Sequence, residues 1–324
     1  KDLKNNNISN IMAKLNGPYR EVTLNNGLHV MLQNTSTQTI SGKLRVNFGA
    51  LNEQPGEEGL AHFLEHTLMT GGSTKYSPEK SDRVRGTFGS YNAMTGLDKT
   101  FFPVDMLSED LALYLDFVSD ITFNPKLDDT RFEEERQRVL RETSDAKSNP
   151  GFKDSQAYQN AFFGDESPHT YFILGNEDVI HSVTPEQMKE FQARGYGAAN
   201  MDLILVGNLP DDVEELVHRN FGEKPTGENT KFQFPKNPNL EGRTLIHTSA
   251  PELYNQDQPQ KSSAQLSIGL VAPTETAEDS YAVGMLAKIL GGDGSSRLFK
   301  TVSQRKGLAY SVGSGYTNQN NSGS

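Results

Sequence analysis

Two histidines and a glutamate lie within five positions of one apolar stretch, GLAHFLEHTLMTGG, residues 59–72. The chain has only 7 histidines among its 324 residues, so a closely spaced pair is a chemical signal. On a helix, positions i, i+3 and i+4 share one face, which puts His62, Glu65 and His66 on the same side. Two imidazoles at this spacing can bind one zinc ion, and the carboxylate between them can reach a water molecule that the metal activates. The pattern therefore indicates a metal-dependent hydrolytic site.

The same residues also fit the solvated face of an amphipathic helix, which is the commoner reason for a lone His-x-x-x-His pair. A third ligand would distinguish the two interpretations, because catalytic zinc usually has three protein ligands and one open position. The charged segment RFEEERQRVLRETSD offers Glu135 and Glu142, two turns apart on one helix face. Charge-rich helices often carry such stripes for solubility alone, so this spacing leaves both interpretations open. The order HxxEH is that of the inverted zinc-peptidase motif.

The elements that must position these residues mix hairpins with helices. Two alternating runs flank Asn25-Asn26-Gly27, which predicts a β-hairpin. Further strands are predicted over residues 42–50, 88–96, 99–106 and 200–209, and helices over 59–72, 109–120, 127–148, 184–196 and 210–221. This order predicts an α+β fold, in which a largely antiparallel sheet carries helices packed on one face.

The length of the chain favours two domains over one. The segment AQLSIGLVAPTE resembles GKLRVNFGALNE, and YAVGMLAKILGGDG resembles GLAHFLEHTLMTGG, in the same order along the chain. This similarity predicts two homologous domains. The predicted divisions are a lead-in, the zinc-binding catalytic domain, a linker and the start of a second domain, at residues 1–19, 20–221, 222–242 and 243–324.

In the second copy, small residues or lysine replace the metal-binding positions, so only the first domain is expected to hold a metal. The second domain is expected to be incomplete, because only 82 residues (243 to 324) follow the linker, against some 220 before it.

Composition excludes several classes of function. The net charge of −11, with no cluster of Lys and Arg, would repel nucleic acid phosphates. No stretch reaches the roughly 18 apolar residues of a membrane span. The chain has no cysteine, which removes disulfides, thiolate nucleophiles and cysteine-bound zinc. Any metal must therefore bind through His, Asp or Glu.

At these residues the chain resembles the pitrilysin and insulinase family of zinc metallopeptidases, the inverzincins. The resemblance is strongest to the branch that includes the mitochondrial processing peptidase and its short bacterial relatives. In that family a glutamate ligand follows the second histidine of HxxEH by about 76 residues, and 142 − 66 = 76 falls on Glu142. Similarity continues through residues 167–209 and 290–312, and in all it covers about residues 20–316.

The resemblance implies a role for each residue of the motif. His62, His66 and Glu142 would bind one Zn²⁺ per chain, and Glu65 would act as the general base. Glu135 matches the family's supporting glutamate, seven residues before the ligand, and would orient a ligand from outside the metal shell. Taken alone, Glu135 also fits an ordinary surface carboxylate.

The resemblance also implies substrate contacts. Asn92 and Ala93 match the family's Asn-Ala pair on an edge strand, where substrate is bound as an added strand. Tyr310 in GLAYSV matches a tyrosine of the second domain that reaches the substrate and could stabilise the oxyanion. The family's arginine, seven residues before that tyrosine, is Ser303 here, which puts this substrate contact in doubt. Without the family, Asn92 is a turn-prone strand residue and Tyr310 an ordinary strand tyrosine.

The resulting prediction is a two-domain zinc endopeptidase that closes over short or unfolded peptides and hydrolyses them. The alternative is a catalytically weak or inactive peptide-binding subunit, since the family includes inactive members that work beside an active partner. A homodimer or a heterodimer with a second family member is accordingly a possible assembly. A third interpretation, a metal-free solvated helix face, implies an unrelated function. The missing cysteines and the resemblance favour a periplasmic or secreted bacterial location without deciding it.

Overall fold

The computed structural model describes residues 19–127, 130–165, 167–233, 244–249, 264–274, 277–319 and 322–323. The described chain divides into two compact units. The first contains the described residues up to Asn149 together with Tyr171–Phe232, and the second contains Pro150–Thr170 and the described residues from Gln233 onward. The predicted lead-in lies outside the described residues except for Tyr19, and the predicted linker is described only to residue 233. The domain boundaries predicted from the sequence therefore stay predictions.

The first unit is built on a seven-stranded sheet with the order β1-β2-β9-β3-β7-β5, in which β6 also pairs with β7. Every pair of neighbouring strands is antiparallel except β2 and β9, which are parallel. The strands are β1 Tyr19–Thr23, β2 His29–Asn34, β3 Thr39–Val46, β5 Ser90–Tyr91, β6 Met94–Thr95, β7 Thr100–Leu107 and β9 Met201–Gly207, and the short strands β4 Gly72–Ser73 and β8 Pro125–Lys126 form a separate pair.

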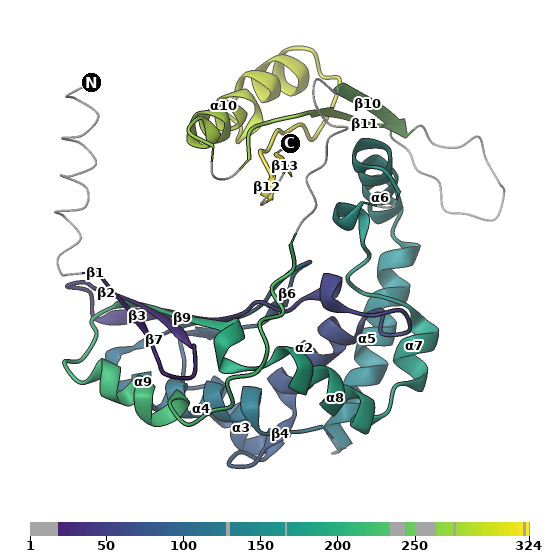
Figure 1. The fold of residues 1–324 in the computed structure, drawn as a ribbon. Helices are drawn as coiled ribbons and strands as arrows, with labels where there is room; N and C mark the ends of the chain where they lie inside the picture. Colours follow the sequence, from purple (N-terminus) through teal and green to yellow (C-terminus); the bar gives the residue numbers. More distant parts are fainter. Residues whose placement is uncertain are drawn as a thin grey trace. The chain divides into compact units, whose positions relative to one another are not determined.

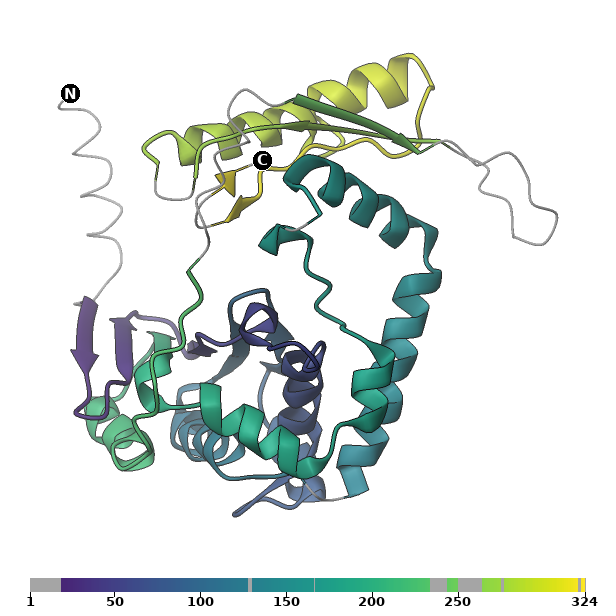
Figure 2. The same cartoon turned by 45° about the vertical axis from the view of Figure 1, so that its right-hand side comes forward.

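The predicted hairpin is formed by β1 and β2, drawn as the purple arrows in Figure 2. Thr23 pairs with His29 across the turn, and Gly27 has a φ of +88°, a left-handed conformation that favours glycine. The predicted strand over residues 88–96 is wrong as a single element, because it is two short strands, β5 and β6, on either side of Asn92 and Ala93.

Helices of the first unit cover one face of the sheet, as Figure 1 shows for α2, α4 and α9. Their bounds are α2 Leu60–Thr70, α3 Pro78–Arg85, α4 Leu111–Phe123, α5 Thr130–Ser148, α7 Glu177–Ser182, α8 Pro185–Gly195 and α9 Val213–Phe221, with single 3₁₀ turns at Ala50–Asn52, Ser108–Asp110 and Ala198–Asn200. The prediction of an antiparallel sheet with helices on one face is confirmed.

Alternation along β3 shows how the sheet separates its two faces. Ile40 and Leu44 are fully buried, whereas Lys43 between them is partly exposed. A Cβ on Gly42 would meet the side chain of Tyr114 from α4, so this helix packs directly on the inner face of β3. The inner face therefore supplies the hydrophobic core, and the other face is left to polar and partly exposed side chains.

The predicted helix over residues 184–196 begins as its sequence indicates. Thr184 is the N-cap of α8, and its hydroxyl accepts a hydrogen bond from the Gln187 amide. The Gln187 side chain in turn accepts one from the Thr184 amide, which completes a capping box. Pro185 occupies the first turn, where its missing N–H is not needed.

The second unit contains α6 Pro150–Phe163, the 3₁₀ turn Pro168–Thr170, β10 Thr244–Ser249, β11 Gln265–Leu270, α10 Ser280–Gly291, the π-helix Phe299–Arg305 and the pair β12 Asn318–Gln319 and β13 Ser322–Gly323. Strands β10 and β11 are antiparallel. A Cβ on Gly269 would meet Tyr158 and Phe162, so α6 packs against this strand pair. The strand and helix predicted as a second copy are β11 and α10. No helix among the described residues is both long enough and apolar enough to cross a membrane.

Candidate metal centre

Helix α2 carries the HxxEH residues and is anchored by its apolar side. Phe63 and Leu64 are fully buried in the core. Before the helix, Gly59 has a φ of +101°, and the Glu53 carboxylate accepts hydrogen bonds from the amides of Gly59 and Ala61 at 2.9 and 2.8 Å. Tyr171 also donates to Glu53, at 2.7 Å. A carboxylate at this position satisfies amides at the helix N-terminus and complements its dipole.

Helix α5 packs against α2 and brings a second set of carboxylates to it. The rings of Phe63 and Phe132 lie 4.8 Å apart between the two helices. On its far side, α5 is tied to α7 by Arg136, whose guanidinium donates to carbonyl oxygens at the end of α7. The Thr143 hydroxyl, one residue from Glu142, lies 2.9 Å from the Val139 carbonyl of its own helix and 3.2 Å from the Leu174 carbonyl, so it also contacts the segment before α7. The position of α5 is therefore set by contacts on both sides.

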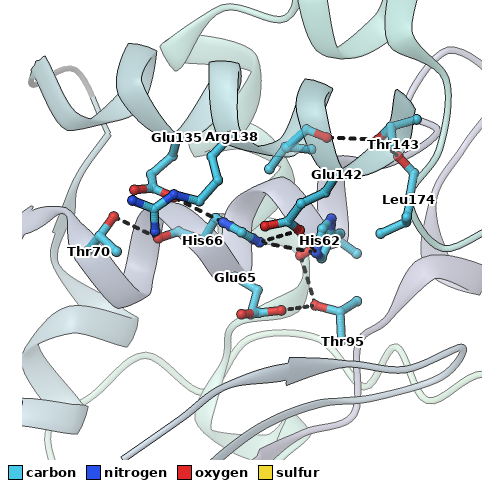
Figure 3. A network of polar contacts seen from close by, with 12 residues as sticks. His62, Glu65, His66, Thr70, Thr95, Glu135, Arg138, Glu142, Thr143 and Leu174 are labelled. Atoms are coloured by element: carbon cyan, nitrogen blue, oxygen red, sulfur yellow. Dashed lines mark hydrogen bonds and ion pairs between the residues drawn. The ribbon is translucent and has the colours of Figure 1, made fainter. Parts of the chain in front are cut away.

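The side chains of His62, His66 and Glu142 converge between these helices (Figure 3). The Nε2 atoms of the two histidines are 3.2 Å apart. Glu142 Oε2 lies 3.4 Å from His66 Nε2 and 3.7 Å from His62 Nε2. In the described part of the chain this is the one group of three His, Asp or Glu residues whose ligand atoms lie within 4.8 Å of one another.

These separations fit a tetrahedral cation. Two ligands at about 2.0–2.1 Å from a tetrahedral zinc ion lie about 3.3–3.4 Å from each other. The three measured separations, 3.2, 3.4 and 3.7 Å, fall around that value. Two imidazole nitrogens and one carboxylate oxygen are also a typical donor set for catalytic zinc. The residues present therefore fit a zinc ion with one coordination position left open.

The face of α2 that carries His62 and Glu65 is buried, so it is not the solvated helix face that the sequence alone also allowed. His62 and Glu65 are each 8% exposed, and the Glu135 side chain is fully buried. Burying ionisable groups is costly unless they are paired or bind a metal. This burial therefore argues against both the solvated helix face and the interpretation of Glu135 as a surface carboxylate.

Glu135 contacts the outer nitrogen of a predicted ligand. Its Oε2 lies 3.0 Å from His66 Nδ1 and 3.5 Å from Arg138 Nε. Burial, which would raise the pKa of Glu135, is outweighed by the hydrogen bond from His66 and the charge of Arg138, so the pKa is lowered. An ionised Glu135 accepts the Nδ1 proton of His66, which leaves the lone pair of Nε2 available to a metal ion. His62 Nδ1 is buried and makes no hydrogen bond to the described residues.

We expect Glu135→Gln to weaken zinc binding by about 10- to 100-fold without abolishing it, because an outer partner of a ligand histidine is neutralised. Competition with a chromogenic zinc chelator measures the dissociation constant. The matched control is Glu134→Gln, one residue away on α5, where the side chain is 60% exposed and pairs with Arg131. Equal zinc affinity in both variants would contradict a role for Glu135.

The two histidines differ in protonation when no metal is bound. Burial and the nearby charge of His66 lower the pKa of His62 to about 3. Burial would also lower the pKa of His66, but the hydrogen bond with Glu135 and the charges of Glu65 and Glu142 outweigh it and raise that pKa. His62 is therefore a neutral imidazole across the physiological range, whereas His66 binds a proton as the pH falls.

This difference predicts the pH dependence of zinc affinity. Below the raised pKa of His66, zinc must displace one proton from His66 and none from His62, so the dissociation constant should rise about tenfold for each pH unit of acidification. Chelator competition from about pH 8 down to about pH 5 checks the slope. A slope of two protons would mean that His62 is protonated as well, and a flat profile would mean that His66 is not a ligand.

Glu65 lies on the same face of α2, with its carboxylate next to Thr95 of β6. Thr95 Oγ1 donates to Glu65 Oε2 at 3.1 Å (Figure 3). Burial raises the pKa of the Glu65 carboxyl, although the charge of His66 and the hydrogen bonds from Thr95 oppose the shift. A carboxylate with a raised pKa in a site of this kind is suited to general-base catalysis.

The remaining predicted residues lie on other elements. Asn92 and Ala93 connect β5 to β6, at the strand that carries Thr95. Tyr310 belongs to the second unit, where its side chain is 99% exposed, and Ser303 lies within the π-helix. The first unit thus brings together His62, Glu65, His66, Glu135 and Glu142. The roles of Asn92, Ala93 and Tyr310 stay predictions.

Sequence reasoning missed two residues of this centre, Glu53 and Thr95. Glu53 lies seven residues before Leu60, the first residue of α2, so it is not at the N-cap position where an acidic residue would signal the contact (60 − 53 = 7). Thr95 follows Ala93 at the two-residue period of a strand and so lies on the same side of it. Neither pattern identifies the atoms that are contacted.

Comparison with known proteins gives consistent matches over both units. The family model described as insulinase (peptidase family M16) matches residues 29–166, and the one described as peptidase M16 inactive domain matches residues 182–324. A Rickettsia bellii protein with the name uncharacterized zinc protease is 31% identical over 296 residues, which are 90% of this chain and 68% of that protein.

Solved structures resemble the chain in fold. A protease from Helicobacter pylori matches with a TM-score of 0.73 and 22% identity, over 94% of this chain and 73% of that chain. A peptidase M16 inactive domain from Pseudomonas fluorescens matches with a TM-score of 0.74 and 19% identity, over 95% and 73% of the two chains. At these identities the likeness establishes the shared α+β fold.

Proposed function

The chain belongs to the insulinase family, peptidase family M16, whose curated relatives are named zinc proteases, and from that premise we propose that it is a zinc-dependent endopeptidase that hydrolyses short or unfolded peptides. The observation that carries the proposal is the convergence of His62, His66 and Glu142 at separations suited to tetrahedral zinc, beside the carboxylate of Glu65. His62, His66 and Glu142 would hold one zinc ion per chain. When bound, zinc would supply Lewis-acid activation of a water molecule and of the peptide carbonyl.

The chain's own residues would transfer the protons and bind the substrate. Glu65 accepts the proton released as water attacks the peptide carbon, and then donates it to the leaving amine nitrogen. Asn92 and Ala93 bind the peptide backbone as an added strand, because β6 pairs only with β7 among the described strands. Main-chain pairing tolerates many sequences and requires an extended peptide, which favours unfolded substrates. Tyr310 would stabilise the oxyanion from the second domain.

A chelation experiment tests the proposed function. The protein should cleave an unstructured fluorogenic peptide, lose activity after treatment with a zinc chelator, and regain it when zinc is added back. A folded protein that contains the same peptide sequence serves as the substrate control and should stay intact. Cleavage that continues in the zinc-free protein would contradict the proposal.

A peptide-binding subunit is the second candidate function. The specific observation that favours it is Ser303, which stands where the family resemblance places an arginine. Such a subunit would work beside a second, active family member in a dimer. Under this alternative the zinc-loaded protein binds an unfolded peptide without cleaving it, and cleavage requires the partner.

A further inference from the structure

Among the described residues, the hydroxyl of Thr95 is the hydrogen-bond donor to the carboxylate of the general base proposed above. The Thr95 hydroxyl lies 3.1 Å from Glu65 Oε2 and 3.4 Å from the Ala61 carbonyl oxygen (Figure 3). Because the hydroxyl has a single proton and the carboxylate is the nearer acceptor, the hydrogen bond to Glu65 is the stronger of the two. Glu65 is 8% exposed, so little solvent is available to replace this bond.

Several hydrogen bonds fix the backbone around Thr95. Thr95 pairs with Thr100 of β7, whose hydroxyl donates to the Phe48 carbonyl at 2.9 Å. The turn after it is closed by the bond from the Gly96 amide to the Lys99 carbonyl at 2.7 Å. Bonds at this turn, including one from the Ala50 amide to the Gly96 carbonyl at 3.1 Å, attach it to the segment that leads into α2. The position of the Thr95 hydroxyl is therefore defined relative to α2.

Strand alternation places Thr95 at the proposed peptide-binding edge. The Asn92 amide donates to the Pro103 carbonyl of β7, so the backbone of Asn92 faces that strand. In an antiparallel ladder the backbone groups alternate, which turns those of Ala93 and Thr95 toward the open edge. The Thr95 hydroxyl contacts Glu65, and Ala93 is the edge-facing residue two positions earlier. A peptide strand paired along this edge would therefore reach the Glu65 carboxylate at the next edge-facing residue after Ala93, which is Thr95.

We propose that Thr95 is a positioning residue that holds the Glu65 carboxylate at the end of the peptide-binding edge, where a peptide paired with β6 presents its bond for hydrolysis. The hydroxyl occupies Oε2 and leaves the other carboxylate oxygen free to accept the proton of water. Fixing a base in one orientation removes the cost of ordering it during the reaction. This inference rests on the proposed peptidase function.

The test uses Thr95→Val, which keeps the shape of the side chain and removes the hydroxyl. We expect kcat for an unstructured peptide to fall about tenfold or more, because a hydrogen bond to a charged group is lost. KM and zinc content should not change, and Thr95→Ser should restore kcat. The matched control is Thr87→Val, which removes a threonine hydroxyl bonded to the Val84 carbonyl away from the site. A Thr95→Val enzyme with parental kcat, or one whose loss is not restored by serine, would overturn the inference.

A structural readout separates this inference from the peptidase assignment. In crystals of the zinc-loaded Thr95→Val protein, the Glu65 carboxylate should leave the place that it occupies in the parent and in Thr95→Ser. If the parent hydrolyses no peptide, the proposed function fails, and the position of Glu65 in these crystals still decides the role of Thr95. An unmoved Glu65 carboxylate in Thr95→Val would count against that role whatever the activity.

Discussion

Glu65→Gln should lower kcat for peptide hydrolysis by about 10²- to 10⁴-fold, the range attributed to a general base, while about one zinc ion per chain remains bound. The amide keeps the size of the carboxylate and its contact with Thr95 but cannot accept the proton of an attacking water. Glu65 is not one of the three converging ligand residues, so metal binding should survive. Steady-state kinetics on an unstructured peptide, with metal analysis of the same sample, measure both effects.

The control for this variant is Glu58→Gln, on the loop before α2, where the carboxylate accepts hydrogen bonds from the Gly56 amide away from the metal centre. That variant should keep the parental kcat. Peptide cleavage at the parental rate by Glu65→Gln would rule out Glu65 as the base. Loss of zinc along with activity would instead assign Glu65 to metal binding.

Glu142→Gln should lose most of its zinc, with a larger drop in affinity than the about 10- to 100-fold expected for an outer hydrogen-bond partner. The substitution removes the one anionic side chain among the three converging residues and leaves a neutral amide oxygen facing two histidine nitrogens, at 3.4 and 3.7 Å in the parent. The side chain is 43% exposed, so folding should be little affected. Elemental analysis of zinc per chain and thermal unfolding together check the prediction.

Asp145→Asn is the matched control for Glu142→Gln, because this exposed residue is three positions along α5 and outside the group of converging ligands. It should bind zinc like the parent. A Glu142→Gln protein that retains parental zinc would show that the third ligand is a different residue. Zinc missing from the parent as well, even after incubation with the metal, would favour the peptide-binding subunit.

Local patterns were sufficient to predict most elements of the first unit. The hairpin at Asn25-Asn26-Gly27, the helix of HxxEH and the capped helix at Thr184 each depend on contacts between neighbours in sequence. Such contacts leave a periodic or capping signal that can be read directly. Helix α6 of the second unit was not predicted; Pro150 is its first residue, where the missing N–H of proline is not needed.

The features of the candidate site also divide into those that the sequence predicted and those that only the tertiary structure located. The sequence by itself determined that His62, Glu65 and His66 share a helix face, because helical geometry fixes the neighbours at i+3 and i+4. The family spacing added Glu142. Only the tertiary structure decided that Glu142 approaches both histidines and that Glu135 is buried against His66. The contact of Thr95 with Glu65 also depends on the tertiary structure. These contacts join residues 30 or more positions apart, and they depend on how α5 and β6 pack against α2, which no local periodicity encodes.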